Sequence, residues 1–417
     1  MRILHTSDWH LGRTLHGYSR ADEHEAFLQE VVELCADVDL VILSGDVFET
    51  ANPPIEAEEL FFDTLARLGD GGRRAVVVIA GNHDSPDRLA AAQPLSARHG
   101  VWVFGRPGDE LEPLAVPAKD AARVAMDPLG PSAIALRWPD GRRANIAALP
   151  YPSEARLRRL LAAPTGDHDR QRAYSRWVGQ AFAKLEQDFD PGAVNLATAH
   201  LAVRSCMPRP SERVLVGGAY QIDAGDLPRK AHYTALGHLH FPQLVEDAPG
   251  LARYAGAPLA MRFSERDDPR VHTIVEAHPG QPASVELLPV SAGRPLVLWE
   301  AASLSEVQRS VQNGRYENAF IDLIVDVSRH LTHAQLASLK RLPRDFVRIT
   351  PRLPQATATE SADPIERRDL PVDVLFREFY RQQTGAEPDQ GLVELFLELA
   401  DGPEAEERPS PAKKRAG

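Results

Sequence analysis

A buried strand that ends in a polar turn is the feature that most constrains this chain. Ala75–Ala80 (AVVVIA) is an uninterrupted apolar run rich in β-branched residues, which predicts a buried strand. Gly81 ends the run, and the next three side chains can each bind a metal ion or move a proton: Asn82, His83 and Asp84. In open α/β sheets, ligands bind at the carboxyl ends of the strands. A plain turn would use the same residue types, so both interpretations stay open at this point.

This strand belongs to an alternation of strand-like and helix-like segments at the start of the chain. Short apolar runs predict strands at Met1–Leu4 and Leu40–Ser44, and helical spacing of apolar residues predicts helices at Asp22–Ala36 and Ile55–Leu68. A further helix is expected from Pro86, with Ser85 as its N-cap, to about Arg98. Strands that alternate with helices imply a parallel sheet.

More strand-like segments follow in the middle of the chain. They are Ala133–Arg137, Ala144–Leu149, Val194–Leu201, Tyr233–Leu239, Leu251–Ala255, Val271–Glu276 and Ser284–Leu288. A longer helical region, broken near Pro164, is expected at about 153–188. The last three strands suggest a second sheet packed on the first. Residues 1–290 are therefore expected to form one large α/β domain.

The composition changes near Pro289–Pro295, and the rest of the chain divides into shorter segments. We expect a small α+β unit at 291–352, a Pro/Ala/Thr linker at 353–368, a helical segment at 369–402 and a disordered tail at 403–417. The apolar spacing within 371–400 suits a helical pair that binds a partner. Packing of the same helices on their own chain is the alternative.

The composition limits the partners and the compartment. The formal net charge of −12 argues against broad binding of polyanions, so any contact with nucleic acid must be local, metal-assisted or shared with a partner. The longest apolar runs have the length of strands, so we expect no membrane span. The only cysteines, Cys35 and Cys206, suggest a reducing cytoplasm without disulfides. No G-x-x-x-x-G-K-[ST] sequence is present, so we expect no P-loop ATP site.

Five short polar clusters share one position, at or just after the end of a strand-like run. They are Asp8-Trp9-His10, Gly45-Asp46, Gly81–Asp84, Ala199-His200 and Gly237–His240. Strands of one sheet bring their carboxyl ends together, so the clusters are expected to meet at one edge. Their candidate metal ligands are Asp8, His10, Asp46, Asn82, His200, His238 and His240. Carboxylate, amide and imidazole ligands suit divalent manganese, iron or zinc.

These are more ligands than one ion can bind while it keeps a coordination position open. Two ions that share the Asp46 carboxylate fit better. In a strand, residues i and i+2 share a face, so each D-x-H and H-x-H pair could reach one ion. A single histidine is more often structural than a ligand, and we interpret the histidines outside the clusters as structural or surface residues. Arg13 and His16 could approach a substrate, and Cys206 is interpreted as a loop residue.

The order D-x-H, G-D, G-N-H-D, H and G-H-x-H resembles the calcineurin-like metallophosphoesterases, whose fold is a β-sandwich flanked by helices. The segments MRILHTSDWHLGRTLHG, SGDVFE, AGNHDS, ALGHLH and YAGAPLAMRFSE are similar to the nuclease-subunit family of the bacterial SbcCD complexes. This resemblance covers about residues 1–290. More weakly, the small α+β unit resembles the capping domain of that family, and the C-terminal helices resemble its partner-binding segment.

The resemblance implies roles for individual residues. One metal would be held by Asp8, His10, Asp46 and His240, and the other by Asp46, Asn82, His200 and His238. The metal of this family is usually manganese, so two Mn²⁺ ions are expected. His83 would be the catalytic histidine, with Asp84 holding it. Archaeal relatives carry a further histidine where this chain has Glu49, so a second catalytic group is left open here.

The implied activity is a manganese-dependent DNA nuclease in DNA repair, recombination and replication, with exonuclease activity on double strands and endonuclease activity on single strands and hairpins. A separate SMC-like ATPase subunit with a long coiled coil would bind the C-terminal helices, and the nuclease would form a homodimer within a heterotetramer. A metal-activated hydroxide would attack the phosphate in line, while His83 protonates the leaving oxygen. A small-molecule phosphodiesterase or phosphomonoesterase and a non-catalytic scaffold are the rival interpretations.

Overall fold

The computed structural model describes residues 1–113, 122–152, 167–208 and 221–353, together with scattered positions between 374 and 396. The chain divides into two compact units. The larger unit comprises Met1–Trp299, Gly314–Leu323 and Pro343–Ile349, and the smaller comprises Glu300–Asn313, Ile324–Leu342 and Thr350–Gly417. All candidate metal ligands lie in the larger unit.

A six-stranded sheet is built mainly from the first hundred residues. Its order is β17-β16-β1-β4-β5-β6. The strands are β1 (Arg2–Thr6), β4 (Leu40–Ser44), β5 (Ala75–Ile79), β6 (Val101–Phe104), β16 (Val271–Glu276) and β17 (Ser284–Pro289). Strands β1, β4, β5 and β6 are parallel, which confirms the predicted parallel sheet.

A second, seven-stranded sheet faces the first. Its order is β14-β15-β13-β10-β9-β8-β7. The strands are β7 (Ala125–Gly130), β8 (Ala133–Arg137), β9 (Arg143–Leu149), β10 (Val194–His200), β13 (Tyr233–Gly237), β14 (Gln243–Leu244) and β15 (Ala252–Tyr254). Strands β9, β10, β13 and β15 run parallel to their neighbours in this group. Two short ribbons, β2 (Thr14–Leu15) with β3 (Tyr18–Ser19) and β11 (Ala202–Val203) with β12 (Gln221–Ile222), complete the larger unit.

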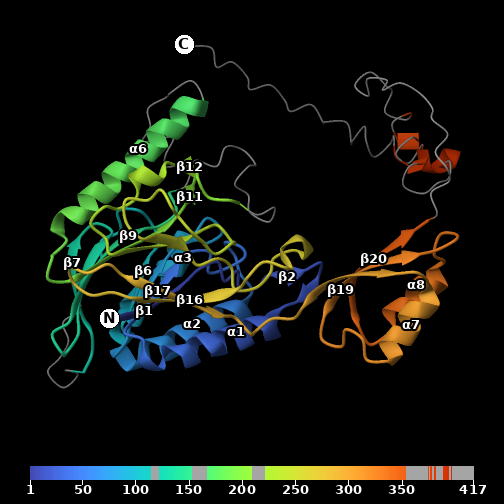
Figure 1. The fold of residues 1–417 in the computed structure, drawn as a ribbon, viewed down its shortest axis with the longest axis horizontal. Coiled ribbons are helices and arrows are strands. Elements are labelled where there is room, and N and C mark those ends of the chain that lie inside the picture. Colours follow the sequence, from blue (N-terminus) through green and yellow to red (C-terminus); the bar gives the residue numbers. More distant parts are fainter. Residues whose placement is uncertain are drawn as a thin grey trace, which may run out of the picture. The chain divides into compact units, whose positions relative to one another are not determined.

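The two sheets enclose a shared apolar core. Ile42 and Val77 of the first sheet pack in one cluster with Ile146 and Leu196 of the second. Helices α1 (Ala21–Leu34) and α2 (Ile55–Gly69) cover the other face of the first sheet, and α6 (Asp167–Leu185) covers the other face of the second. Figure 1 shows α1 and α2 on one side of the strands and α6 on the opposite side. The larger unit is therefore a β-sandwich flanked by helices, as expected.

The membership of the last predicted strands differs from the expectation. Only β15 joins the second sheet, whereas β16 pairs antiparallel with β1, and β17 pairs with β16. His5 of β1, for example, lies opposite Thr273 of β16. Strand β4 pairs with only one edge of β1. The other edge also needs hydrogen-bond partners for its backbone, and β16 supplies them.

The helix expected to run from Pro86 to about Arg98 is broken. It consists of α3 (Pro86–Ala90), α4 (Gln93–Ser96) and a 3-10 turn at Ala97–His99. Ser85 is the N-cap of α3, with Pro86 at its first position, as predicted. Pro94 lies at the start of α4, where it has no N–H to continue the hydrogen bonds of the preceding turn. Of the helical region expected at 153–188, the part before residue 167 lies outside the described residues.

A three-stranded sheet follows the sandwich along the chain. Its strands are β18 (Leu296–Ala301), β19 (Phe320–Asp326) and β20 (Asp345–Arg352), and the division between the two units runs through them. The smaller unit contains α7 (Leu304–Gln312) and α8 (His333–Lys340). Ser303 caps α7 by accepting the N–H of Glu306, and Thr332 forms a capping box with Gln335 on α8.

The C-terminal expectations fall largely outside the part of the chain that the structure describes. This holds for the linker beyond residue 353, the tail at 403–417 and most of the segment at 369–402. Within that segment, Phe376 and Phe396 are helical and their rings stack with centroids 4.0 Å apart. Among the described helices, none is long and apolar enough to cross a membrane.

A buried polar contact joins the two sheets inside the core. The Nδ1 atom of His5 on β1 lies 2.8 Å from the hydroxyl of Tyr233 on β13. Both residues are fully buried. Burial lowers the pKa of His5 to about 3, so its imidazole is neutral in the folded chain at physiological pH.

Acid should therefore destabilise the chain partly through His5. The model-compound pKa is 6.5 and the folded pKa is about 3, so the unfolded chain binds the extra proton. Stability from this residue is complete above about pH 6.5 and is lost as the pH falls toward 3. His5→Gln should reduce the slope of unfolding free energy between pH 6.5 and 5 by up to about 1.4 kcal/mol per pH unit, measured by denaturant titration at each pH. Equal slopes for the two proteins would contradict this.

Candidate metal centre

The polar clusters converge at the carboxyl ends of strands from both sheets. Clusters after β1, β4 and β5 come from the first sheet, whereas His200 ends β10 and the histidines after β13 come from the second. The expectation of a single sheet edge is therefore wrong. The two edges touch, because Ser44 Oγ lies 2.9 Å from Thr198 Oγ1, and a Cβ on Gly237 would lie 2.0 Å from the carbonyl oxygen of Ser44. An all-apolar strand sequence does not reveal which sheet the strand joins.

Left-handed backbone turns aim the candidate ligands into the site. Asp8, His10, Asp46 and His238 have φ angles of 55°, 47°, 49° and 98°. Positive φ is uncommon for residues other than glycine and costs free energy. Backbone hydrogen bonds hold the turns, from Asp8 N to Gly45 O at 3.0 Å and from His10 N to Asp46 O at 3.1 Å. The turns after β1 and β4 therefore support each other.

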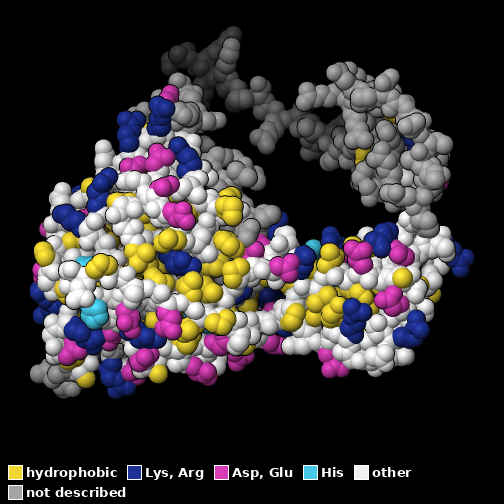
Figure 2. Space-filling view, in the orientation of Figure 1, with side chains coloured by type: hydrophobic (Ala, Val, Ile, Leu, Met, Phe, Trp, Pro, Cys, Tyr) yellow, Lys and Arg dark blue, Asp and Glu magenta, His cyan; other side chains and the backbone are white. Residues whose placement is uncertain are grey.

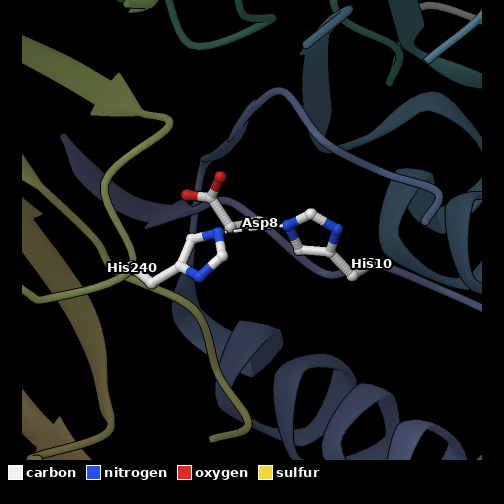
Figure 3. Close-up of side chains that lie close together, drawn as sticks. All are labelled: Asp8, His10 and His240. Carbon is white, nitrogen blue, oxygen red and sulfur yellow. Dashed lines mark hydrogen bonds between the residues drawn. The ribbon is translucent and has the colours of Figure 1, made fainter. Parts of the chain in front are cut away.

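The first group of donors is Asp8, His10 and His240. Their ligand atoms all lie within 4.8 Å of one another, and all three side chains are buried. His10 Nε2 lies 3.2 Å from His240 Nε2. Figure 3 shows the two rings and the carboxylate close together, although His240 comes from a segment far along the chain from the other two.

The second group of donors surrounds the amide oxygen of Asn82. Its Oδ1 lies 3.0 Å from His200 Nε2 and 2.8 Å from His238 Nδ1. Asp46 Oδ2 lies 3.4 Å from His200 Nε2 and 3.7 Å from His10 Nε2 of the first group. Asp46 therefore stands between the two groups, where a shared ligand is expected.

Contrary to the expectation, neither the D-x-H pair nor the H-x-H pair places two ligands on one face of a strand. Asp8 and His10 lie after β1 in left-handed turns, not on one face of a strand. His238 faces Asn82 in the second group, whereas His240 faces His10 in the first. The positive φ of His238 interrupts the alternation of side chains that a strand would impose. The H-x-H pair is thus divided between the two groups.

The electrostatics of the groups suit a bound cation. Burial raises the pKa of Asp8 to about 6, and burial lowers the pKa of His238 to about 3 and that of His240 well below its usual value. For His200, burial acts to lower the pKa, but the carboxylate of Asp46 outweighs it and raises the pKa to about 9. The neutral imidazoles of His238 and His240 offer lone pairs, and the two carboxylates supply negative charge, whereas a cation would bind His200 in exchange for its proton. This donor set fits borderline divalent cations.

The turn after β5 places His83 beside the donor groups. Its Nδ1 lies 2.7 Å from the carbonyl oxygen of Glu49, and its backbone N–H donates to Asp46 Oδ1 at 2.9 Å. The ring is therefore oriented by Glu49, not by Asp84 as the resemblance implies. The Asp84 carboxylate is buried and accepts backbone N–H groups from Val47 at 3.2 Å, Phe48 at 3.0 Å and Gly81 at 2.8 Å. Asp84 thereby ties the turn after β4 to the turn after β5.

The other residues singled out in the sequence contribute no ligand atom to either donor group. Arg13 binds the Glu49 carboxylate at 2.8 Å, and His16 has its ring centroid 6.5 Å from that of Phe263. Cys206 is buried in an apolar cluster beside the second sheet. These positions give Cys206 a packing role and leave Arg13 closest to the centre.

Two residues near the donors were missed or undervalued in the sequence. The Tyr151 ring centroid lies 6.2 Å from that of His238 and 6.1 Å from that of His200. Tyr151 follows β9 just as the other clusters follow their strands, and this position was the available signal. In the sequence, Glu49 stands out only as a departure from archaeal relatives, yet its carboxylate contacts His10 at 3.0 Å.

Comparisons with known proteins identify the family of the domain that carries both donor groups. The calcineurin-like phosphoesterase family matches residues 1–242, a range that includes every residue of both donor groups. The SbcD subunit of nuclease SbcCD from Bacillus subtilis (strain 168) is 40% identical over 412 residues, which cover 98% of this chain and 100% of that protein.

Two further proteins of the same name are similar to this chain. The one from Rhodobacter capsulatus is 30% identical over 399 residues, 90% of this chain and 93% of that protein. The one from Escherichia coli (strain K12) is 32% identical over 307 residues, 72% of this chain and 70% of that protein.

Replacement of Asp46 tests whether two ions would share its carboxylate. Asp46→Asn should weaken the binding of two Mn²⁺ ions in a calorimetric titration, because Asp46 lies between the groups, whereas His240→Asn should weaken only one. Asp87→Asn is the matched control, since its carboxylate is 70% exposed and pairs with Arg106. If Asp46→Asn bound one ion with unchanged affinity, Asp46 would not be shared.

Proposed function

This chain belongs to the calcineurin-like phosphoesterase family and, within it, to the SbcD subunits of nuclease SbcCD, and from that premise we propose that it hydrolyses the phosphodiester bonds of DNA at the buried centre. It is a metal-dependent phosphodiesterase by family. The observation that carries the proposal is the pair of donor groups with Asp46 between them and His83 at their edge.

We assign the ligands in two sets that share Asp46. One ion would be held by Asp8, His10, Asp46 and His240, and the other by Asp46, Asn82, His200 and His238. The contacts that support this are those within each group and the two distances from Asp46 Oδ2. Two divalent cations bound here would polarise the phosphate and make water acidic enough to attack it.

The residues of the chain hold the turns of the centre in place and donate a proton. The Asp84 carboxylate keeps the turns after β4 and β5 together, and the Glu49 carbonyl holds Nδ1 of His83. When His83 is protonated, its Nε2–H donates the proton to the sugar oxygen that leaves as the P–O bond breaks. The charge on the imidazolium also stabilises the negative charge that develops on the phosphate.

The charge distribution of the chain favours a local contact with DNA. The net charge is −12, and Figure 2 shows Lys and Arg side chains interspersed with Asp and Glu on the face in view. The attraction for a DNA phosphate is therefore expected to come mainly from the bound cations and from a partner. Mn²⁺ is the proposed metal because the family resemblance implies manganese, and carboxylate, amide and imidazole ligands are compatible with it.

The relatives are each named as one subunit of a nuclease, which supports a complex with a second subunit. We propose an SbcC-like SMC-type ATPase with a coiled coil as that partner, bound by the segment at 369–402, and a homodimer of this chain within a heterotetramer. The proposed activities are an exonuclease on double-stranded DNA and an endonuclease on single strands and hairpins, in DNA repair, recombination and replication. A reducing cytoplasm suits the free thiols of Cys35 and Cys206.

Replacing His83 should separate metal binding from cleavage. His83→Leu removes the proton donor but none of the proposed ligands, so two Mn²⁺ ions should still bind. Cleavage of double-stranded DNA should fall by about 10²- to 10⁴-fold. His99→Leu, at an exposed histidine in the turn after α4, is the matched control and should cleave at the wild-type rate.

The same assay tests the nature of the substrate. Rapid cleavage by His83→Leu would remove His83 from the mechanism. Turnover of cyclic nucleotides or bis-p-nitrophenyl phosphate without any cleavage of DNA would favour the small-molecule phosphodiesterase. Absence of Mn²⁺ binding by the wild type would favour a non-catalytic scaffold.

Removing residues 369–417 should separate cleavage from assembly. The centre lies wholly in the larger unit, so the truncated chain should still hydrolyse bis-p-nitrophenyl phosphate at a rate close to that of the full chain. Binding to the ATPase subunit, measured by size-exclusion chromatography with light scattering, should be lost. Retained binding would show that the partner docks elsewhere.

A further inference from the structure

We propose that Glu49 is a positioning residue that orients two histidines of the centre at once, His10 through its carboxylate and His83 through its backbone carbonyl. This inference rests on the proposed function for its catalytic part, but its metal-binding part can be measured independently. The residue lies in the turn after β4, between the turns that follow β1 and β5.

The carboxylate of Glu49 sets the orientation of His10. Glu49 Oε2 lies 3.0 Å from His10 Nδ1, while His10 Nε2 faces His240 at 3.2 Å and Asp46 at 3.7 Å. A carboxylate this close to Nδ1 favours the tautomer that carries its proton on Nδ1, which leaves the Nε2 lone pair available to a metal. His10 has 1% of its side chain exposed, so this contact is shielded from water.

Arg13 holds the Glu49 side chain in place. Its guanidinium donates to Glu49 Oε2 at 2.8 Å and to the carbonyl oxygen of Met261 at 3.4 Å. Oε2 thus faces both Arg13 and His10. The backbone N–H of Arg13 also donates to the carbonyl oxygen of His10 at 3.0 Å, so Arg13, Glu49 and His10 form a closed set of contacts.

The contact between Arg13 and Glu49 disfavours a cation at the Glu49 carboxylate. Ligand atoms of His10, Glu49 and His83 lie within 4.8 Å of one another and could in principle hold an ion. However, Arg13 already places a positive charge 2.8 Å from the carboxylate oxygen. A cation at that oxygen would be repelled by the guanidinium. The geometry therefore favours positioning over metal binding.

The backbone of Glu49 sets the orientation of His83. Its carbonyl oxygen accepts the Nδ1–H of His83 at 2.7 Å, and its own N–H donates to the carbonyl oxygen of Leu11 at 3.1 Å. The preceding residue, Phe48, is held by Asp84 through its backbone N–H. The rings of His10 and His83 meet edge to face with centroids 4.8 Å apart. A single residue, Glu49, therefore contacts both the proposed ligand His10 and the proposed proton donor His83.

Variants at Glu49 separate the side chain from the backbone. Glu49→Ala removes the carboxylate, and Glu49→Gln keeps its shape without its charge. Glu49→Gly removes the carboxylate and also loosens the backbone that carries the carbonyl. Glu56→Gln is the control, because Glu56 is an exposed carboxylate at the start of α2 and makes the same change of charge nearby.

The first measurement is a calorimetric titration of the full chain with Mn²⁺. Glu49→Ala should weaken one of the two binding steps by about 10- to 100-fold and leave the other within about twofold, since partners of a metal-bound histidine contribute that much to affinity. Glu49→Gln should show a smaller loss, because an amide oxygen with partial negative charge would still face Nδ1 of His10. Wild-type affinity for both ions in Glu49→Ala would overturn the role of the carboxylate.

The second measurement is the rate of DNA cleavage at saturating Mn²⁺. Glu49→Ala should recover most of the wild-type kcat, because its carbonyl still holds His83. Glu49→Gly should match Glu49→Ala in Mn²⁺ affinity. Its kcat should nevertheless stay at least about tenfold below that of Glu49→Ala. Equal kcat values for these two variants would overturn the role of the carbonyl. A wild-type chain that binds two ions but leaves DNA intact would defeat the proposed function, while the calorimetric comparison would still decide the role of Glu49.

Discussion

The buried carboxylate of Asp46 is the group on which the rest of the centre depends. Burial alone would raise its pKa, but the neighbouring His200 outweighs this and holds the pKa well below the usual range. A buried negative charge is costly unless it is paired, and Asp46 is surrounded by such partners. The N–H of His83 donates to it, and a Cβ on Gly81 would lie only 2.1 Å from its Oδ1. The turn after β5 can approach this closely only because glycine occupies that position. The position of His83 is therefore set by the same carboxylate that is proposed to bridge the ions.

The sandwich brings together ligands that one sheet could not place so closely. Parallel strands of each sheet end on the same side of the core, and the contact between Ser44 and Thr198 joins the two edges. Gly237 permits this approach, since any side chain there would meet the carbonyl oxygen of Ser44. The groups then face each other across the junction, with Asp8 accepting the backbone N–H of His238 at 3.1 Å. Changes in the packing between the sheets would therefore alter the spacing of the donor groups.

The features that can be predicted from the sequence are those set by local patterns of residues. Strands such as β5 and the turns after them follow from apolar runs that stop at glycine, and the donor residues follow from their place after those runs. Sheet membership did not follow, because a strand that is apolar throughout fits either sheet of a sandwich. The partner of His83 did not follow either, since the acceptor is the backbone carbonyl of Glu49 and any residue type supplies one. The left-handed turn at His238 was missed because only tertiary contacts stabilise such a backbone in a residue other than glycine.

The charge of the chain connects metal binding to DNA binding under the proposed function. The chain has a net charge of −12, and at the centre the carboxylates of Asp8 and Asp46 are balanced only in part by the protonated imidazole of His200. Two divalent cations, if bound as proposed, would add positive charge at the centre, less the proton that one of them displaces from His200. The Arg13 guanidinium is already engaged by Glu49, so it contributes less to this attraction than a free arginine would. Affinity of the isolated chain for DNA ends should therefore depend on metal occupancy more than on its surface charge.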